Sequence, residues 1–140
     1  MGIGREQVSL TNQQEELLRE AEKAARKAYV PVSGFRVGAA LKTAGGVYTG
    51  CNIENASLGL SMCAERVAIF KAVSAGERDF LKMIVVNVES NDAPPCGACR
   101  QVMAEFAPEL EVTYRHGGGF STRLVRELLP DAFGSRNGGA

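Results

Sequence analysis

The sequence predicts an α/β protein in which helices cover both faces of a mixed β-sheet, as a three-layer α/β/α sandwich. Helix-like and strand-like segments follow one another in the order α-β-β-α-β-α-β-α, which is typical of helices packed on a sheet. The segment FLKMIVVNVE at 80–89 is almost continuously apolar, as a central strand is. The 140 residues are 45% hydrophobic, enough for one buried core. We therefore expect a single domain over residues 1–140, with an ordered core at about 11–134.

The first element is a helix over residues 11–29, TNQQEELLREAEKAARKAY. Thr11 followed by Gln14 is a capping-box pattern, in which each residue satisfies a free backbone N–H of the other. An alanine-rich apolar stripe at helical spacing follows, which gives the helix one face to bury. Pro31 ends the helix, because the residue before a proline avoids helical backbone angles.

The remaining elements follow from apolar periodicity and from the glycines and prolines at their boundaries. Strands are expected at 36–43, 47–51, 80–89 and 110–115, with a hairpin through Ala44, Gly45 and Gly46 joining the first two. Helices are expected at about 62–74, 96–106 and 122–129. The connecting loops are 31–35, 52–61 and 90–95, HGGGF at 116–120 is a turn, and the tail SRNGGA at 135–140 is loose.

Composition excludes several classes of partner. Sixteen Lys and Arg residues balance sixteen Asp and Glu residues, so no net field attracts nucleic acid or a membrane surface. The chain lacks the basic stripe with interleaved aromatic residues that binds single-stranded nucleic acid. No apolar run reaches the length of a membrane span, and the start MGIGREQVSLTNQQ is too polar for the core of a signal peptide. We expect a soluble, cytoplasmic protein that binds neither nucleic acid nor membrane.

The stretch PPCGACRQ at 94–101 contains a C-x-x-C pair, which has several common uses. In a reducing cytosol, metal or catalytic roles are favoured over disulfides, although four cysteines would also allow a disulfide framework. At the start of a helix, Cys96 and Cys99 lie on one face, and the helix N-terminus favours their thiolates. The pair alone fits either a redox couple or half a metal site.

Cys63 favours the metal site. It opens the other predicted helix, so three thiolates at two helix N-termini could meet at one point. Three protein ligands leave the fourth position of zinc open for water, as in catalytic sites, whereas a structural site would need a fourth ligand. Cys51 and His116 are the spare candidates, and Cys51 in a strand is better explained as buried packing.

Glu65 follows Cys63 by two residues and would lie close to a metal without having to bind it. A carboxylate there could accept a proton from an activated water, although alone it would merely favour the helix dipole. Arg66, three residues after Cys63, could contact that sulfur and offset the negative charge of three thiolates. For Arg100 we slightly favour a solvated surface charge.

C-A-E at 63–65 and P-C-G-A-C at 95–99 resemble the zinc nucleoside deaminases, whose H-x-E…P-C-x-x-C signature has a three-cysteine variant. The chain is similar to the small homotetrameric cytidine deaminases from about residue 14 to 134. The most specific matches are FRVGAAL, GCNIENAS, CAERVAIFKAV, PCGACRQV and ELLPDAF. The resemblance implies a cytidine deaminase-like sheet of about five strands, one zinc ion per chain and a homotetramer with sites near subunit interfaces. It also implies hydrolytic deamination of cytidine and 2′-deoxycytidine in pyrimidine salvage.

The resemblance also assigns roles to residues. It implies that Cys63, Cys96 and Cys99 bind zinc and that Glu65 transfers protons between water, N3 of the ring and the leaving amino group. The substrate-binding positions are Asn52 and Glu54 for the ribose 3′-hydroxyl, Phe35 for the pyrimidine face, the backbone of Ala64 for the polar edge of cytosine, and Phe133 for a neighbouring subunit's site. Taken alone, Phe35 would be an ordinary core residue and Asn52 an ordinary turn residue.

Two positions depart from the family pattern. Val32 and Leu58 stand where these deaminases often have tyrosines that belong to an aromatic network at subunit contacts. We hypothesise a roomier or more apolar pocket mouth that tolerates altered pyrimidine nucleosides.

Three alternatives remain at this point. A blasticidin-S-type deaminase would share the zinc and Glu65, but the intact pair Asn52 and Glu54 suits a free ribose. A non-catalytic zinc protein would leave Glu65 without a role, and it would need a fourth zinc ligand, for which this sequence has no obvious candidate. A thiol oxidoreductase using the C-x-x-C pair would leave Cys63 unexplained.

Overall fold

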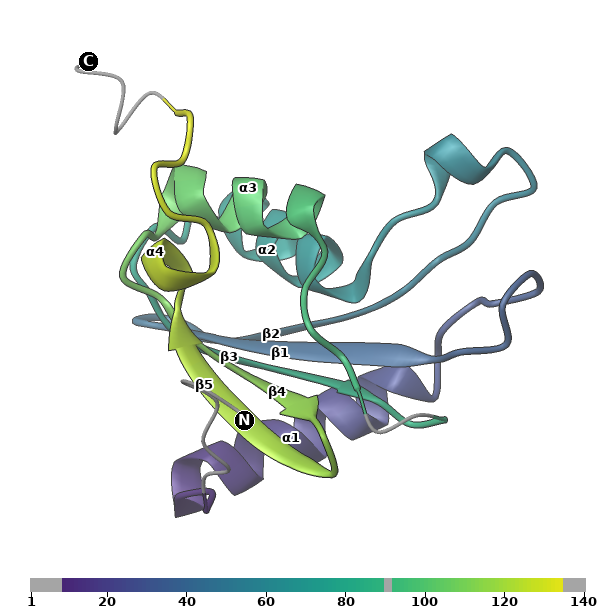
Figure 1. The fold of residues 1–140 in the computed structure, drawn as a ribbon, viewed down its shortest axis with the longest axis horizontal. Coiled ribbons are helices and arrows are strands. Elements are labelled where there is room, and N and C mark those ends of the chain that lie inside the picture. Colours follow the sequence, from purple (N-terminus) through teal and green to yellow (C-terminus); the bar gives the residue numbers. More distant parts are fainter. Residues whose placement is uncertain (1–8, 90–91, 135–140) are drawn as a thin grey trace.

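A computed structural model describes residues 9–89 and 92–134, so the predicted loose tail at 135–140 lies outside the described residues. The fold is a five-stranded sheet with helices on both faces (Figure 1), which confirms the predicted α/β sandwich. The strand order is β2-β1-β3-β4-β5. The strands are β1 (Val37–Thr43), β2 (Gly46–Cys51), β3 (Phe80–Asn87), β4 (Glu111–His116) and β5 (Gly119–Leu124). The helices are α1 (Asn12–Ala25), α2 (Ala64–Ser74), α3 (Gly97–Phe106) and α4 (Val125–Leu128), with a 3₁₀ turn at Leu58–Leu60.

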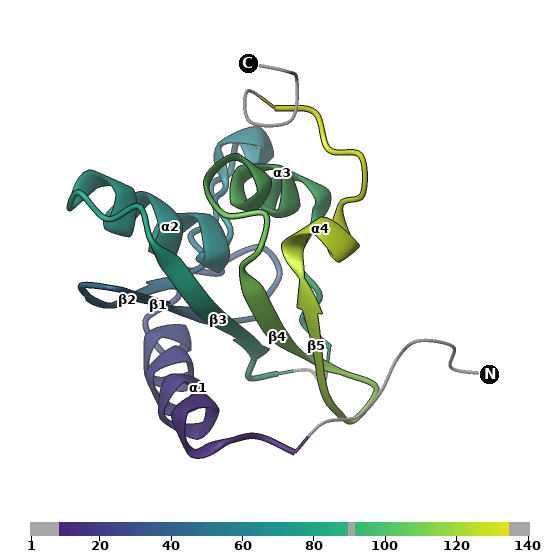
Figure 2. The same cartoon turned by 90° about the vertical axis from the view of Figure 1, so that its left-hand side faces the viewer.

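The sheet is mixed because one of its pairings is parallel. β3 and β4 run parallel, with α3 between them in the chain, and the other neighbours are antiparallel. Helix α1 lies on one face, and α2, α3 and α4 lie on the other (Figures 1 and 2). Within the described ranges, no helix has the length and apolarity needed to cross a membrane.

Two cores fill the space between the layers. On the α2–α3 side, the fully buried side chains of Leu41 in β1, Met83 in β3 and Val112 in β4 pack in one core with both helices. The helices contribute Ile69 from α2 and Met103 from α3. On the α1 side the core is smaller and alanine-rich; it contains Leu17, Ala21, Ala40, Ile84 and Val86. β3 contributes to both cores, which explains its continuous apolar sequence.

Helix α1 starts as predicted and ends early. Thr11 is its N-cap and forms a complete capping box with Gln14. The predicted last turn, up to residue 29, is wrong because the helix ends at Ala25 and Tyr29 instead bridges to Ile53. Because of this bridge, the chain leaves the helix axis after Ala25 and runs beside residue 53 before it enters β1.

The C-terminal prediction also needs correction. We expected a turn at 116–120 and a helix at 122–129, but β5 occupies Gly119–Leu124 and α4 is only Val125–Leu128. Gly117 and Gly118 both have positive φ, 60° and 86°, and form a two-residue turn that pairs His116 with Gly119. The extra strand completes the five-stranded sheet.

Candidate active site

Three cysteines from two helices converge above one end of the sheet. Cys63 is the N-cap of α2, Cys96 is the N-cap of α3, and Cys99 lies in the first turn of α3. Neither N-cap cysteine caps its own helix with its side chain, so both sulfurs point elsewhere. The three sulfur atoms all lie within 4.8 Å of one another, and Cys63 Sγ is 3.8 Å from Cys96 Sγ. The structure thus brings together the ligand set that the sequence predicted.

A glycine allows α2 to place Cys63 there. A Cβ atom at Gly50 in β2 would collide with the backbone of α2, at Ala64 O and at Ala68 N. Only a residue without a side chain lets the first turn of this helix lie directly on the strand. The position of Cys63 therefore depends on a residue of the neighbouring strand.

The electrostatics of the cluster suit a metal cation. A hydrogen bond from the Cys99 thiol, together with Arg66, lowers the pKa of Cys63 to about 5 in the metal-free protein. Arg66 Nη2 donates to Cys63 Sγ at 3.3 Å, as the predicted spacing required. The Cys63 thiolate in turn raises the pKa of Cys99. Three soft sulfur donors, one already ionised at neutral pH, fit Zn²⁺ with one coordination position left open.

Among the described residues, Glu65 is the one buried carboxylate at this cluster. It lies in the first turn of α2 and only 4% of it is exposed. Burial is the main reason that the pKa of its carboxyl group is raised to about 7. The nearby Cys63 thiolate also raises this pKa, by more than the Arg66 guanidinium lowers it. A carboxyl group with such a pKa can take up and release a proton near neutral pH.

The cluster opens into a pocket of about 230 Å³. Cys63, Cys96 and Glu65 line its floor. The remaining lining residues are Val37, Asn52, Ala64, Val85, Asn87, Asp92, Ala93 and Pro94. The described ranges also contain surface hollows of about 410, 370 and 570 Å³, the first of which shares Asn87 with this pocket, and no cysteine lines any of these three. The chemistry of the lining, rather than its size, distinguishes this pocket.

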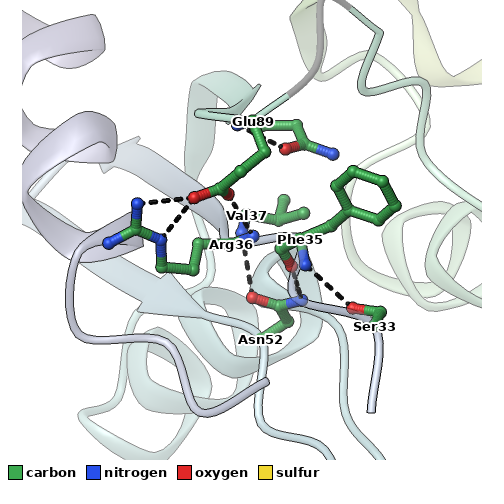
Figure 3. A network of polar contacts seen from close by, with 7 residues as sticks. Ser33, Phe35, Arg36, Val37, Asn52 and Glu89 are labelled. Carbon is green, nitrogen blue, oxygen red and sulfur yellow. Dashed lines mark hydrogen bonds and ion pairs between the residues drawn. The ribbon is translucent and has the colours of Figure 1, made fainter. Parts of the chain in front are cut away.

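Val37 at the start of β1 and Asn52 line the pocket together with the cysteines, and Figure 3 shows the polar contacts that hold them. The Asn52 side chain accepts from Val37 N at 2.9 Å and donates to Phe35 O at 2.9 Å. Ser33 Oγ accepts from Phe35 N at 3.0 Å. The Phe35 side chain is half exposed, so the prediction from its position alone, a core residue, is wrong.

Glu54 organises the loop before β1. Its Oε1 accepts from Val32 N and Ser33 N, at 2.9 and 3.0 Å, and its Oε2 accepts from Ser33 Oγ. The hydrogen bond from the Ser33 hydroxyl lowers the pKa of Glu54. Glu54 is therefore ionised and carries one remaining acceptor position of the four that a carboxylate offers.

Other candidate residues occupy different positions. Phe133 is 89% exposed, and its carbonyl accepts from Gln101 Nε2 at 2.6 Å on α3. The favoured surface role of Arg100 is wrong, because its guanidinium donates to the carbonyls of Pro95 and Leu128 at 2.8 and 3.0 Å. Among the described residues, Cys51 and His116 are not part of the cysteine cluster.

Sequence reasoning missed the far wall of the pocket. Asn87 ends β3, and Asp92, Ala93 and Pro94 follow five to seven residues later, just before Cys96. The available signal was a polar residue, Asn87, at the end of an apolar strand that leads toward the C-x-x-C motif.

Comparison with known proteins agrees with this geometry. Residues 11–114 match the cytidine and deoxycytidylate deaminase zinc-binding region. A cytidine deaminase of Halalkalibacterium halodurans is 52% identical over 120 residues, covering 84% of this chain and 91% of the relative. One from Sporosarcina psychrophila is 48% identical over 122 residues, covering 85% and 90%. The crystal structure of a cytidine deaminase from Burkholderia pseudomallei matches with a TM-score of 0.80 and 47% identity, covering 89% of this chain and all of that one.

Proposed function

The chain belongs to the family of cytidine and deoxycytidylate deaminases, and we propose that its pocket binds cytidine or 2′-deoxycytidine and replaces the 4-amino group with oxygen. Zinc-dependent deamination of cytidine is the activity that membership of this family establishes. The observation that carries the residue assignments is the buried Glu65 beside three converging thiols.

Cys63, Cys96 and Cys99 hold the zinc ion, one per chain. When bound, the zinc supplies Lewis-acid activation of water, by lowering the pKa of that water toward neutrality. Arg66 offsets the negative charge of the thiolates through its bond to Cys63 Sγ, and the helix N-termini of α2 and α3 act in the same sense.

Glu65 carries the proton transfers. Its carboxylate accepts the proton that the attacking water loses and delivers it to N3 of the pyrimidine, while the water oxygen bonds to C4. It then passes a second proton from the same oxygen to the 4-amino group. The C4–N bond breaks, ammonia leaves, and C4 becomes the carbonyl of uridine. The raised pKa of Glu65 supports both directions of transfer.

The nucleoside is held by residues that do no chemistry. Asn52 Nδ2 has a second N–H beyond its bond to Phe35 O, and Glu54 has its remaining acceptor position; together they suit the ribose 3′-hydroxyl. Phe35 offers a half-exposed aromatic face to the ring, and the buried backbone of Ala64 lies at the pocket floor. Anchoring the sugar fixes C4 over the attacking water.

Exposed apolar residues on the loops and near the C-terminal end of the described chain favour a homotetramer. Tyr29, Val32, Leu58, Leu60 and Phe133 are each at least 59% exposed, which is costly for a monomer. A neighbouring copy would cover them and would close the pocket mouth, with Phe133 reaching a second subunit's site. Light scattering should give the mass of four chains, and Phe133→Ala should shift it toward smaller species. A monomer at micromolar concentration would contradict this assembly.

The unpaired cysteines of the site require a reducing compartment, so we propose a cytoplasmic location for a single-domain protein.

The decisive experiment is ultraviolet-monitored turnover by the zinc-loaded protein. We expect wild type to remove the 4-amino chromophore of cytidine and 2′-deoxycytidine, Glu65→Ala to retain zinc without turnover, and Glu16→Ala on the exposed face of α1 to behave as wild type. Blasticidin S tests the alternative substrate. Turnover of blasticidin S without turnover of cytidine would replace the proposed substrate, and none at all by folded, zinc-loaded protein would refute the deaminase assignment.

A further inference from the structure

An ion pair joins the start of β1 to the segment that follows β3. Arg36 Nε donates to Glu89 Oε2 at 2.7 Å, and Arg36 Nη2 lies 2.5 Å from the same oxygen. Glu89 Oε1 accepts the backbone N–H of Arg36 at 2.7 Å. The glutamate therefore binds both the side chain and the main chain of one residue (Figure 3). The hydrogen bonds from Arg36 lower the pKa of Glu89, so the pair is ionised at neutral pH.

This pair extends the β1–β3 ladder by one residue. Val37 is the first residue of β1 and lies opposite Asn87, the last of β3. Beyond them, Val88 N donates to Arg36 O at 3.0 Å, and Glu89 N donates to Asn87 Oδ1 at 3.0 Å. The two chain segments are thus held together past the end of the regular sheet.

The residues on either side of Arg36 carry the proposed substrate wall. Asn52 is oriented by Phe35 O and Val37 N, the two backbone groups that flank Arg36. Figure 3 shows the Arg36 side chain and the Phe35 ring extending to opposite sides of the chain. Any movement of this three-residue segment therefore displaces the aromatic face and the amide of Asn52 together.

From its N-terminal side, this segment is held through Ser33, whose Oγ accepts from Phe35 N and donates to Glu54 Oε2. The loop that contains Ser33 also has a φ of 76° at Gly34, and the Arg36–Glu89 pair ties the segment to the chain that follows β3. Asn87, whose side chain accepts from Glu89 N, lines the same pocket as Asn52. The Arg36–Glu89 pair therefore connects the β1 side of the pocket, with Asn52, to the β3 side, with Asn87.

We propose that Arg36 and Glu89 are positioning residues that lock Phe35, Asn52 and Asn87 in the geometry that binds the nucleoside, without touching it. This inference rests on the proposed function, because it assigns substrate contacts to that wall. The side chains of Arg36 and Glu89 are 41% and 29% exposed, so the pair itself is partly solvated. Its effect on binding should be correspondingly moderate.

Steady-state kinetics of cytidine deamination test the proposal. We expect Glu89→Ala to raise KM by roughly three- to tenfold with kcat within about twofold, as loss of a partly exposed charge-assisted pair allows. Arg36→Ala should raise KM less, because the backbone N–H of residue 36 keeps its acceptor. The double variant should match Glu89→Ala, since the contacts of the Arg36 guanidinium within the described residues are to Glu89. The matched control is the exposed pair Arg126 and Glu109, whose alanine variants should keep the wild-type KM.

A second measurement does not depend on turnover. Amide hydrogen exchange at Val37, whose N–H donates to Asn52 Oδ1, should accelerate in Glu89→Ala and not in Glu109→Ala. An unchanged KM together with unchanged exchange at Val37 would refute the positioning role of Arg36 and Glu89. A fall in kcat with an unaltered KM would also refute it. If wild type fails to deaminate cytidine, the proposed function fails, while exchange at Val37 still decides whether the pair holds the wall.

Discussion

Replacing Gly50 by alanine should damage the metal site from a distance. The new Cβ atom would lie 2.6 Å from Ala68 N and closer still to Ala64 O, both backbone atoms of α2. Bringing the Ala68 contact to an ordinary 3.4 Å requires α2 to withdraw by at least about 0.8 Å, and relieving the closer Ala64 contact requires more. Cys63 would move with the helix, whereas Cys96 and Cys99 on α3 would stay. Metal–ligand distances tolerate only about 0.2 Å, so the cluster should lose zinc affinity as well as stability.

The expected loss of stability in Gly50→Ala follows from overpacking of the interior. Extra atoms in a filled interior typically cost about 1–3 kcal/mol, which for a chain of this length lowers Tm by roughly 4 °C per kcal/mol. Thermal unfolding followed by circular dichroism measures the stability, and a colorimetric zinc assay after gel filtration measures the bound metal. Both should fall for Gly50→Ala.

The matched control is Gly45→Ala in the β1–β2 turn. Its Cβ would also meet an atom too closely, but that atom belongs to the carboxylate end of Glu77, which can swing aside. We expect its cost to stay below about 1 kcal/mol with full zinc content. The reasoning would be refuted if Gly50→Ala bound zinc and unfolded like wild type, or if both variants were equally impaired.

Three further predictions concern the site itself. In zinc-free, reduced protein, Glu65→Gln should be more stable than wild type by an amount that grows as pH rises from 4.5 to about 7 and then levels off. Burial raises the carboxyl pKa, so the folded state loses stability as this group ionises, by up to about 3 kcal/mol; a pH-independent difference in urea denaturation would contradict this. Arg66→Gln removes the donor to Cys63 Sγ and should weaken zinc binding by about 10- to 100-fold in a chelator competition, and an unchanged Kd would disprove that role. Replacing Val32 and Leu58 together by tyrosine should narrow the range of pyrimidine nucleosides turned over; identical substrate ranking and assembly would argue against the roomier mouth.

Much of the fold was predictable because its boundaries have local causes. The capping box at Thr11 and the apolar run of β3 each specify an element without reference to the rest of the chain. The hairpin through residues 44–46 is also present, with Thr43 opposite Gly46. Where tertiary pairing decides, prediction from sequence was wrong: Tyr29 leaves α1 because Ile53, far along the chain, offers it a bridge.

The missing strand has a similar explanation. Leu124, Val125 and Leu128 fit a helical stripe, so the sequence favoured a short helix over residues 122–129. The two positive φ angles at Gly117 and Gly118 decide otherwise, because they return the chain beside β4. A two-residue glycine turn between strand-like segments was the signal to weigh more heavily.

For the site, the sequence predicted which side chains meet but not how they are held. The three cysteines and Glu65 come together because their motifs open helices, and that is a local property. The backbone bonds of Asn52, by contrast, depend on a β1 start that no motif describes.

The two N-cap cysteines also give the site a mechanical role. Cys63 and Cys96 are 33 residues apart in the chain, and β3 lies between them. A metal ion bonded to both closes that stretch into a ring, and in the polymer description of a cross-link such a ring removes about 4 kcal/mol of freedom from the unfolded chain. The ion that activates water then also acts as a cross-link that closes the part of the chain containing the central strand, β3. Starving the protein of zinc should accordingly shorten its lifetime as a folded molecule, and abundance should follow the metal supply.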